Sequence, residues 1–330
     1  MARPEEIFTE HRGLLVSVAY RILGSVADAE DVVQEAWLRW SKVDHDAVEQ
    51  PRAFLITIVS RLAIDRLRQV KAQREAYIGP WLPEPWAGAS WAGASRSGAS
   101  RSGASRSGTV LPEPAVTSPE AAPSERAELA DSVELAILVV LETLSPLERA
   151  VFVLREAFEL PFADIAEVIG REEAAARQLA KRAREHVASR RPRFEVDHAR
   201  RRQVTERFLA AAAHGDLDGL TRLLAKDVEL VSDGGGKARS PINVLTGVES
   251  VVRFLVSVST PHATELFLAS IGAEPADSLG FTVAEVNGAP AMVVTAHGKA
   301  ITVVSLVIVN GMIQTIYLVA NPEKLGHVIP

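Results

Sequence analysis

The sequence has no cysteine in its 330 residues. This excludes disulfide bonds, thiol catalysis and metal sites with thiolate ligands, and it fits a protein of the reducing cytoplasm. The formal net charge is −6, which argues against a general polyanion binder but leaves room for a local basic face. Aromatic residues make up only 5% of the chain, yet apolar residues make up 47%. The chain can therefore bury cores for two or three domains.

Signals for secretion or membrane insertion are also scarce. The N-terminal segment MARPEEIFTEHRG is polar and acidic, so we expect no signal peptide. Residues 301–320 carry no charge and have the length of a membrane span. However, Asn310-Gly311 divides this stretch into two runs rich in β-branched residues, which is typical of a β-hairpin. We expect no membrane contact and a cytoplasmic location.

The N-terminal half contains two helical zones separated by a linker. Residues 1–78 show helical periodicity, with Asp28 as a candidate N-cap and a long helix that opens at Pro51 and ends basic. Residues 79–124 are rich in proline, glycine and serine. They include a pentamer array over 86–107 that we expect to be disordered, because it has no periodic apolar residues.

The C-terminal part changes its periodicity. Residues 199–225 predict two helices broken at His214-Gly215, and the apolar period then falls from 3.6 to 2. Asn287-Gly288 marks a further hairpin. Helices followed by a strand meander predict an α+β domain. The expected strands are 227–232, 265–271, 280–286, 291–296, 301–309 and 312–319, with a helix at about 249–258.

Residues 161–184 have the pattern of a helix-turn-helix. Pro161 suits a first helical turn, Gly170 suits the left-handed end of a helix, and Ala166 and Ala176 would let two crossing helices approach closely. Residues 171–193 hold eight basic and three acidic residues, a local charge of +5. A charge run alone would favour an ordinary helical hairpin with a solvated face. The combination favours a DNA recognition helix.

Two segments on either side of the linker resemble a known family. LSPLERAVFVLREAFELPFADIAEVIGREEAAARQLAKRARE resembles region 4 of bacterial RNA polymerase sigma factors, and AYRILGSVADAEDVVQEAWLRW with PRAFLITIVSRLAIDRLR resembles region 2. Together they resemble the extracytoplasmic-function (group 4) type. WLPEP at 81–85, DGGGK at 233–237 and NPEKL at 321–325 resemble the subgroup with a fused C-terminal SnoaL-like domain.

The resemblance implies a multidomain fold, with two all-α sigma domains and a C-terminal α+β SnoaL-like cone. It divides the chain into region 2 (1–78), a linker (79–124), region 4 (125–192) and a SnoaL-like regulatory domain (199–330). The implied partners are core RNA polymerase, through its β′ clamp and β flap, and promoter DNA. Because the fused domain would take its place, no separate anti-sigma factor is expected.

The resemblance also implies roles for matching residues. Those that would bind the polymerase are Asp28, Ala29, Glu30, Asp31, Val32, Val33 and Gln34. Those that would contact the −10 region and its backbone are Arg61, Arg66, Arg68 and Lys71. Those that would face the −35 element are Arg171, Arg177, Gln178, Lys181, Arg182 and Arg184. Ser60-Arg61 departs from the family, since many relatives have an asparagine near this point.

The C-terminal domain admits more than one interpretation. Asp233, Lys237, His262 and His297 could do acid–base work in an isomerase-like pocket, but no catalytic or metal-binding motif accompanies them. We therefore expect no enzyme activity, no metal and no cofactor. The preferred role is regulatory, with WLPEP docked near DGGGK. The interdomain candidates are Trp81, Leu82, Pro83, Glu84, Pro85, Asp233, Gly234, Gly235, Gly236, Lys237, Asn321, Pro322, Glu323, Lys324 and Leu325. The alternative is a stand-alone DNA-binding regulator with a ligand-sensing domain.

Overall fold

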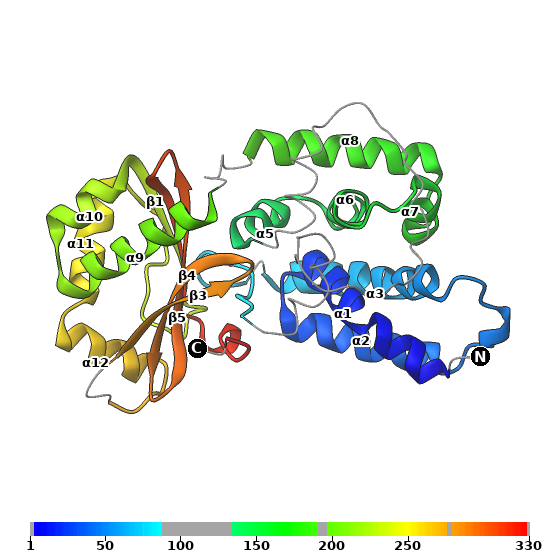
Figure 1. Ribbon diagram of the computed structural model, residues 1–330, viewed down its shortest axis with the longest axis horizontal. Coiled ribbons are helices and arrows are strands. Elements are labelled where there is room, and N and C mark those ends of the chain that lie inside the picture. Colours follow the sequence, from blue (N-terminus) through cyan, green and yellow to red (C-terminus); the bar gives the residue numbers. More distant parts are fainter. Residues whose placement is uncertain (1–2, 75, 88–133, 191–196, 276–278, 329–330) are drawn as a thin grey trace, which may run out of the picture.

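The computed structural model describes residues 3–74, 76–87, 134–190, 197–275 and 279–328. An all-helical part lies beside a part built on one β-sheet, and the two are in contact (Figure 1). The expected disorder of the pentamer array concerns residues that, apart from the first two, lie outside this description. None of the described helices combines the length and the apolar character that a membrane crossing requires.

The first helices pack around a common core. They are α1 (Pro4–Leu23), α2 (Val26–Trp40), the short 3-10 helix η1 (His45–Ala47) and α3 (Pro51–Arg74). The N-cap of α2 is Ser25, whose hydroxyl accepts the backbone N–H of Asp28. The prediction of Asp28 as N-cap is therefore wrong by three residues. Its carboxylate lies in the first turn, where the helix dipole favours negative charge.

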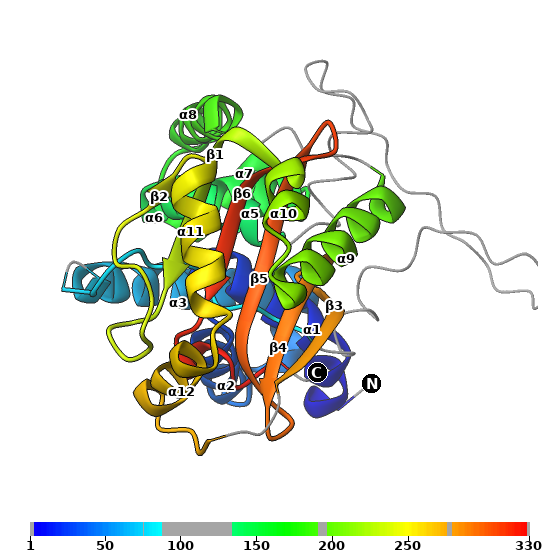
Figure 2. The same cartoon turned by 90° about the vertical axis from the view of Figure 1, so that its left-hand side faces the viewer.

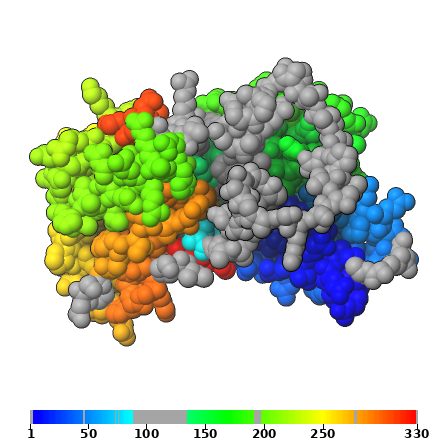
Figure 3. Space-filling model, viewed as in Figure 1, coloured from blue at the N-terminus to red at the C-terminus, as the bar shows by residue number. Residues whose placement is uncertain are grey.

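The second helical group packs directly on the first. It consists of α5 (Leu135–Glu142), α6 (Pro146–Phe152), a π-helical turn η2 (Val153–Ala157), α7 (Phe162–Ile169) and α8 (Glu173–Arg190). Buried side chains of both groups, from Leu67 of α3 to Leu141 of α5, belong to one continuous apolar core. In the space-filling view the blue N-terminal residues lie against the green residues of this group (Figure 3).

The C-terminal domain has one six-stranded sheet of order β2-β1-β6-β5-β4-β3. Only β1 and β6 run parallel. The strands are β1 (Leu224–Asp233), β2 (Leu245–Thr246), β3 (Gly280–Val286), β4 (Ala289–Ala296), β5 (Lys299–Val309) and β6 (Met312–Val319). The helices are α9 (His198–His214), α10 (Leu217–Leu223), α11 (Val248–Val258), α12 (Pro261–Ser270) and the 3-10 turn η3 (Pro322–Lys324).

Most expected strands and turns of this domain are present. Asn287-Gly288 and Asn310-Gly311 form the β3–β4 and β5–β6 turns, so residues 301–320 are a hairpin as predicted. The predicted strand at 265–271 is wrong, because these residues belong mostly to α12. Thr260 caps that helix and Pro261 begins it, and this local signal outweighs the apolar run that follows.

Both faces of the sheet are covered. One face packs under α9, α10 and α11, with core side chains such as Phe208, Val294 and Ile316 (Figure 2). On the other face, Val293 and Val303 pack against Leu82 of the linker and Leu135 of α5. Strands that are buried on both faces read as continuous apolar runs, which explains the uncharged stretch in β5 and β6.

Two phenylalanines of this domain test how much the buried core contributes to its stability. Phe208 of α9 is fully buried, whereas Phe281 of β3 is 44% exposed. We expect Phe208→Ala to lower the free energy of unfolding by about 3–5 kcal/mol, because it leaves a cavity, and Phe281→Ala to have a much smaller effect. Urea unfolding of the two full-length variants, followed by circular dichroism, measures this. Equal losses would contradict the described packing.

Candidate functional site

The helices α7 and α8 form a helix-turn-helix. Gly170 ends α7 at a φ of +63°, a left-handed conformation that a side chain would strain. The buried stripe of α8 consists of small residues and one valine, namely Ala176, Ala180, Ala183 and Val187. These small side chains let α8 lie close to α7 and α6, and they leave the opposite face of α8 to solvent.

The exposed face of α8, together with Arg171 in the turn before it, holds the residues predicted to read DNA. All six are exposed: Arg171, Arg177, Gln178, Lys181, Arg182 and Arg184. Arg177 pairs with Glu173, Lys181 lies 3.9 Å from Glu185, and Arg184 lies 3.0 Å from Glu156 of η2. The side chains of Arg171, Gln178 and Arg182 make no hydrogen bond or ion pair in the described part of the chain. These three can contact a ligand without breaking an ion pair, and Gln178 and Arg182 lie on α8 itself.

The segment predicted to bind polymerase divides into two faces of α2. Glu30, Asp31 and Gln34 are exposed, together with Leu38. The apolar residues of the predicted set, Ala29, Val32 and Val33, are buried in the helical core. Asp28 is partly buried, and its carboxylate forms an ion pair with Arg66 at 2.6 Å. Only the polar face of this segment can therefore contact another protein without unfolding.

The four cations of α3 that were predicted to contact DNA have partners within the chain. Arg61 donates to the backbone carbonyl of Glu167 at 2.7 Å and reaches that of Val168, at the carboxyl end of α7. Arg66 pairs with Asp28, and Arg68 with Asp65 in the same helix. Lys71 donates to the carbonyls of Glu142 and Leu144. Two of the four cations predicted to follow the −10 DNA backbone are thus bound to the second helical group.

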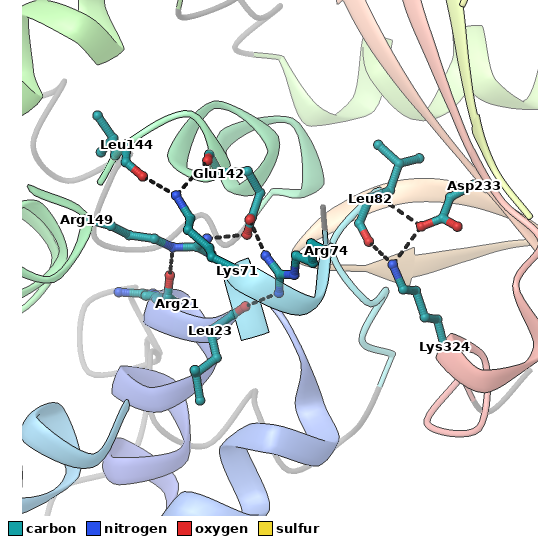
Figure 4. A network of polar contacts seen from close by, with 10 residues as sticks. All are labelled: Arg21, Leu23, Lys71, Arg74, Leu82, Glu142, Leu144, Arg149, Asp233 and Lys324. Carbon is teal, nitrogen blue, oxygen red and sulfur yellow. Dashed lines mark hydrogen bonds and ion pairs between the residues drawn. The ribbon is translucent and has the colours of Figure 1, made fainter. Parts of the chain in front are cut away.

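A network of buried charges joins the two helical groups (Figure 4). The carboxylate of Glu142, at the end of α5, pairs with Arg74 of α3 and with Arg149 of α6. Arg149 is fully buried and also donates to the carbonyl of Arg21 in α1 at 3.0 Å. Arg74 donates to the carbonyl of Leu23 at 3.1 Å. A single carboxylate therefore holds cations from both groups, each of which also bonds the carboxyl end of α1.

The linker segment 81–87 lies between the helices and the sheet. Asp233, at the end of β1, accepts the backbone N–H of Leu82 at 2.8 Å and the ammonium of Lys324 at 2.6 Å. Lys324 also donates to the carbonyl of Leu82 at 2.6 Å. The ring of Trp81 contacts two cations: the guanidinium carbon of Arg74 lies 3.3 Å and the ammonium of Lys324 3.9 Å from the ring centroid. WLPEP, DGGGK and NPEKL thus meet through one buried aspartate–lysine pair.

The glycines after Asp233 form the turn expected there and allow a close approach. Tyr77 donates its hydroxyl to Asp233 at 2.6 Å and accepts from the side-chain amide of Asn321 at 2.8 Å. A Cβ atom at Gly235 would lie 2.3 Å from that amide, so a side chain cannot fit there. Lys237 and Glu323, by contrast, form an exposed ion pair at the rim.

Glu84 connects the linker to the start of α2. It is buried, and its carboxylate accepts the backbone N–H of Val26 at 2.7 Å. Its backbone carbonyl accepts the hydroxyl of Tyr20 at 2.6 Å, and Asn287 of the β3–β4 turn donates to that hydroxyl at 2.7 Å. Burial raises the pKa of Glu84, although the helix N-terminus and His327 favour its charged form.

The remaining residues of the three motifs flank these contacts. Pro83, Pro85 and Leu325 are buried, Gly234 and Gly236 lie in the turn after β1, and Pro322 is exposed.

The four residues considered for acid–base catalysis are not brought together. Asp233 is fully enclosed by its partners from the linker and the C-terminus. His262 is exposed on α12, and His297 lies in the β4–β5 turn at a φ of +51°. Within the described ranges, no group of three or more histidine and carboxylate side chains is arranged to hold a metal ion.

Several interdomain residues were absent from the sequence prediction. Glu142, Arg74, Arg149, Tyr20 and Asn287 belong to this class, as does the buried pair of Arg201 on α9 with Glu134 at the start of α5. Each looks like an ordinary helix or turn residue in the sequence. One signal in the sequence could have indicated them, namely a charged residue at a position that helical periodicity assigns to the core. Arg149, next to the buried Ala150 and Val151, is an example.

Comparison with known proteins agrees with this arrangement. A family model of sigma-70 region 2 matches residues 7–73, and one of sigma-70 region 4 matches residues 134–187. The chain is 37% identical over 319 residues to the ECF RNA polymerase sigma factor SigJ of Mycobacterium tuberculosis, covering 96% of this chain and 91% of that protein. It is 32% identical to a probable ECF sigma factor of that species, SigI, covering 96% and 92%. The crystal structure of SigJ matches with a TM-score of 0.66 and 34% identity, covering 96% of both chains.

The two helical groups, their order and the helix-turn-helix define a sigma factor, the class of subunit that directs RNA polymerase to promoters. The chain belongs to the extracytoplasmic-function (ECF) family of RNA polymerase sigma factors. The predicted fold class is confirmed, with two helical sigma domains and a SnoaL-like α+β domain. Core RNA polymerase and promoter DNA follow as partners, and the interpretation as a stand-alone regulator is not favoured.

The buried position of Lys324 predicts how stability depends on pH. Burial lowers the pKa of Lys324 to about 8, against the opposing effect of Asp233. Between pH 8 and about 10 the unfolded chain keeps a proton that the folded chain has lost, so the free energy of unfolding should rise with pH by up to about 1.4 kcal/mol per unit. Tyr77 has a raised pKa and acts in the opposite direction only at higher pH.

Urea unfolding of the wild type and of Lys324→Arg between pH 7.5 and 9.5 tests this dependence. The arginine keeps the charge but does not titrate in this range, so its profile should lack the additional rise. Parallel profiles for the two proteins would show that Lys324 keeps its proton in the folded state.

Proposed function

We propose that this chain is a promoter-specificity subunit that is closed when free and opens on RNA polymerase. In the closed form, Arg61 and Lys71 of region 2 bind backbone carbonyls of region 4, and this observation carries the proposal. The centres of −10 and −35 elements lie ~25 base pairs apart, or ~85 Å along the duplex. Region 2 and region 4 share one core here, so they must separate before they can read both elements.

The proposed polymerase contact is the polar face of α2. Glu30, Asp31 and Gln34 would face the β′ clamp, and exposed Leu38 extends the same side of the helix by one turn. An acidic surface of this kind attracts a basic helical partner, because opposite charges steer association and fix its register. Ala29, Val32 and Val33 would act indirectly, by holding α2 on the core. Region 4 would contact the β flap.

The proposed −35 contact is the exposed face of α8. Gln178 and Arg182 are free of polar partners in the described chain, so they are the best candidates for base contacts: glutamine can pair with adenine and arginine with guanine. Arg171, Arg177, Lys181 and Arg184 would meet phosphates, which position the helix without reading sequence. In region 2, Arg61, Arg66, Arg68 and Lys71 would serve the −10 backbone.

The fused C-terminal domain would restrain the closed form. It holds segment 81–87 through Asp233 and Lys324, and it holds α5 of region 4 through the pair of Arg201 with Glu134. The linker and region 4 are thus bound to the same domain. We expect this domain to supply the restraint, without a separate anti-sigma factor. No catalytic role is proposed for it.

Substitutions on α8 should separate base reading from positioning. Gln178→Ala and Arg182→Ala should each weaken binding of the reconstituted holoenzyme to a −35-containing promoter by roughly 5- to 150-fold, the range of one lost base contact. Arg184→Ala is the matched control for a phosphate contact, and it should weaken binding to specific and nonspecific duplexes alike. Competition between specific and nonspecific duplexes gives the measurement. Equal losses on both duplexes would assign Gln178 and Arg182 to phosphate contacts.

Weakening the docked linker should favour the open form. Asp233→Asn removes the charge that pairs with Lys324, and the milder Tyr77→Phe removes one bond to Asp233. We expect both to increase the distance between fluorophores on regions 2 and 4 and to raise promoter transcription several-fold, more for Asp233→Asn. Glu323→Gln, in the exposed pair with Lys237, is the control.

Folded content is checked by circular dichroism, and binding to core polymerase by fluorescence anisotropy. If the folded variants bind core polymerase normally but match the wild type in both distance and transcription, docking of the linker does not restrain the protein.

A further inference from the structure

A hollow on the C-terminal domain lies away from the linker and from both DNA-reading helices. Its volume is about 350 Å³, and it is formed where α9 ends and α10 begins. The two helices lie side by side on the face of the sheet opposite the linker (Figure 2). Its lining residues are Arg207, Ala210, Ala211, His214, Asp216, Gly219, Arg222 and Leu223. None of the contacts described above uses this surface.

Two arginines without a carboxylate partner line the hollow. Arg201, Arg202 and Arg253 are each held by a carboxylate. Arg207 and Arg222, in contrast, have no hydrogen-bond or ion-pair partner in the described part of the chain. Both arginines line the same hollow. Two unpaired cations that share a hollow repel each other unless an anion lies between them.

The other polar groups of the hollow are already oriented. His214 lies with Nδ1 2.7 Å from the carbonyl of Ala210, which leaves Nε2 toward an outside partner. Asp216 is the one carboxylate of the lining, and its Oδ1 accepts the backbone N–H of Gly219 at 2.9 Å as the N-cap of α10. Asp216 caps the helix and, within the described residues, forms no ion pair with Arg207 or Arg222.

We propose that this hollow binds the phosphate group of a small phosphorylated molecule. A carboxylate is satisfied by one arginine fork, whereas a phosphate offers enough charge and oxygen atoms for Arg207, Arg222 and His214 together. The volume exceeds that of a bare phosphate ion and lies in the range of small-molecule pockets. The apolar side chains of Ala211 and Leu223 would contact the body of the molecule. Nothing in this assignment depends on the proposed opening of the sigma domains.

The position of the hollow gives an occupant access to region 4. Arg207 and His214 lie on α9, and the same helix carries Arg201, whose guanidinium makes two bonds to the carboxylate of Glu134 at 2.7 and 3.1 Å. Glu134 is the N-cap residue of α5, and Glu142 lies at the other end of that helix. A ligand that shifts α9 against α10 would therefore act on α5, the helix that carries Glu142.

Calorimetric titration of the full-length protein with sodium pyrophosphate tests the site, with ionic strength held constant by chloride. We expect one saturable event that Arg207→Gln and Arg222→Gln each weaken at least tenfold, as expected for the loss of a charge-assisted bond. Arg253→Gln removes an exposed arginine from α11 and should leave binding unchanged. The absence of saturable binding, or equal weakening by Arg253→Gln, would overturn the proposal.

A second measurement excludes DNA as the source of the phosphate. The affinity of the holoenzyme for a promoter duplex falls with salt, with a slope set by the number of neutralised phosphates. Arg207→Gln and Arg222→Gln should leave this slope unchanged. A decrease of about one per variant would place DNA in the hollow and overturn the assignment to a small molecule.

Discussion

The closed structure depends on the carboxylate of Glu142. It pairs with Arg74 from the end of α3 and with Arg149 from α6, and both cations also bond the carboxyl end of α1. Removing one member of such a buried group is costly, because the remaining charges stay out of water without compensation. Arg74 also stacks on Trp81, so the same network reaches the linker. Region 2, region 4 and the linker are therefore fixed by groups that satisfy one another only when all three are together.

The sheet imposes the second constraint, since both of its faces are apolar. Its own helices cover one face, but Val293, Val303 and Val319 on the other face need a cover from outside the domain. Leu82 and the start of α5 supply it. The buried backbone of the linker then needs partners, and Asp233, Lys324 and Asn287 provide them. The aspartate–lysine pair is thus a consequence of apolar packing, because a linker that lies on the sheet must have its polar groups satisfied there.

The sequence was informative where structure is local and silent where it is not. Gly170, the alanines of α8 and the two Asn-Gly turns act through their own backbone, so helix, turn and hairpins could be predicted. The apolar run at 265–271 predicts a strand, but the cap at Thr260 and Pro261 starts a helix that includes most of it. The partners of Arg61 could not be predicted, because a basic helix end looks the same whether it meets phosphate or the carbonyls of another helix. Phosphates and backbone carbonyls both bind cations, and only the three-dimensional arrangement shows that Arg61 contacts carbonyls in this structure.

Under the proposed function, this equivalence would make the closed form reversible. Separating regions 2 and 4 re-exposes apolar surface at about 25 cal/mol per Å², but it also returns Arg74, Glu142 and Lys71 to water, which recovers much of the hydration lost on closing. In the proposed opening, Arg61 and Lys71 would exchange backbone carbonyls for the phosphates of DNA, so promoter binding would replace contacts that opening removes. An interface made only of leucine and valine would offer DNA nothing to replace. Under the proposed function, the mixture of an apolar core with exchangeable cations would hold the free chain closed while letting polymerase and promoter compete for the same groups.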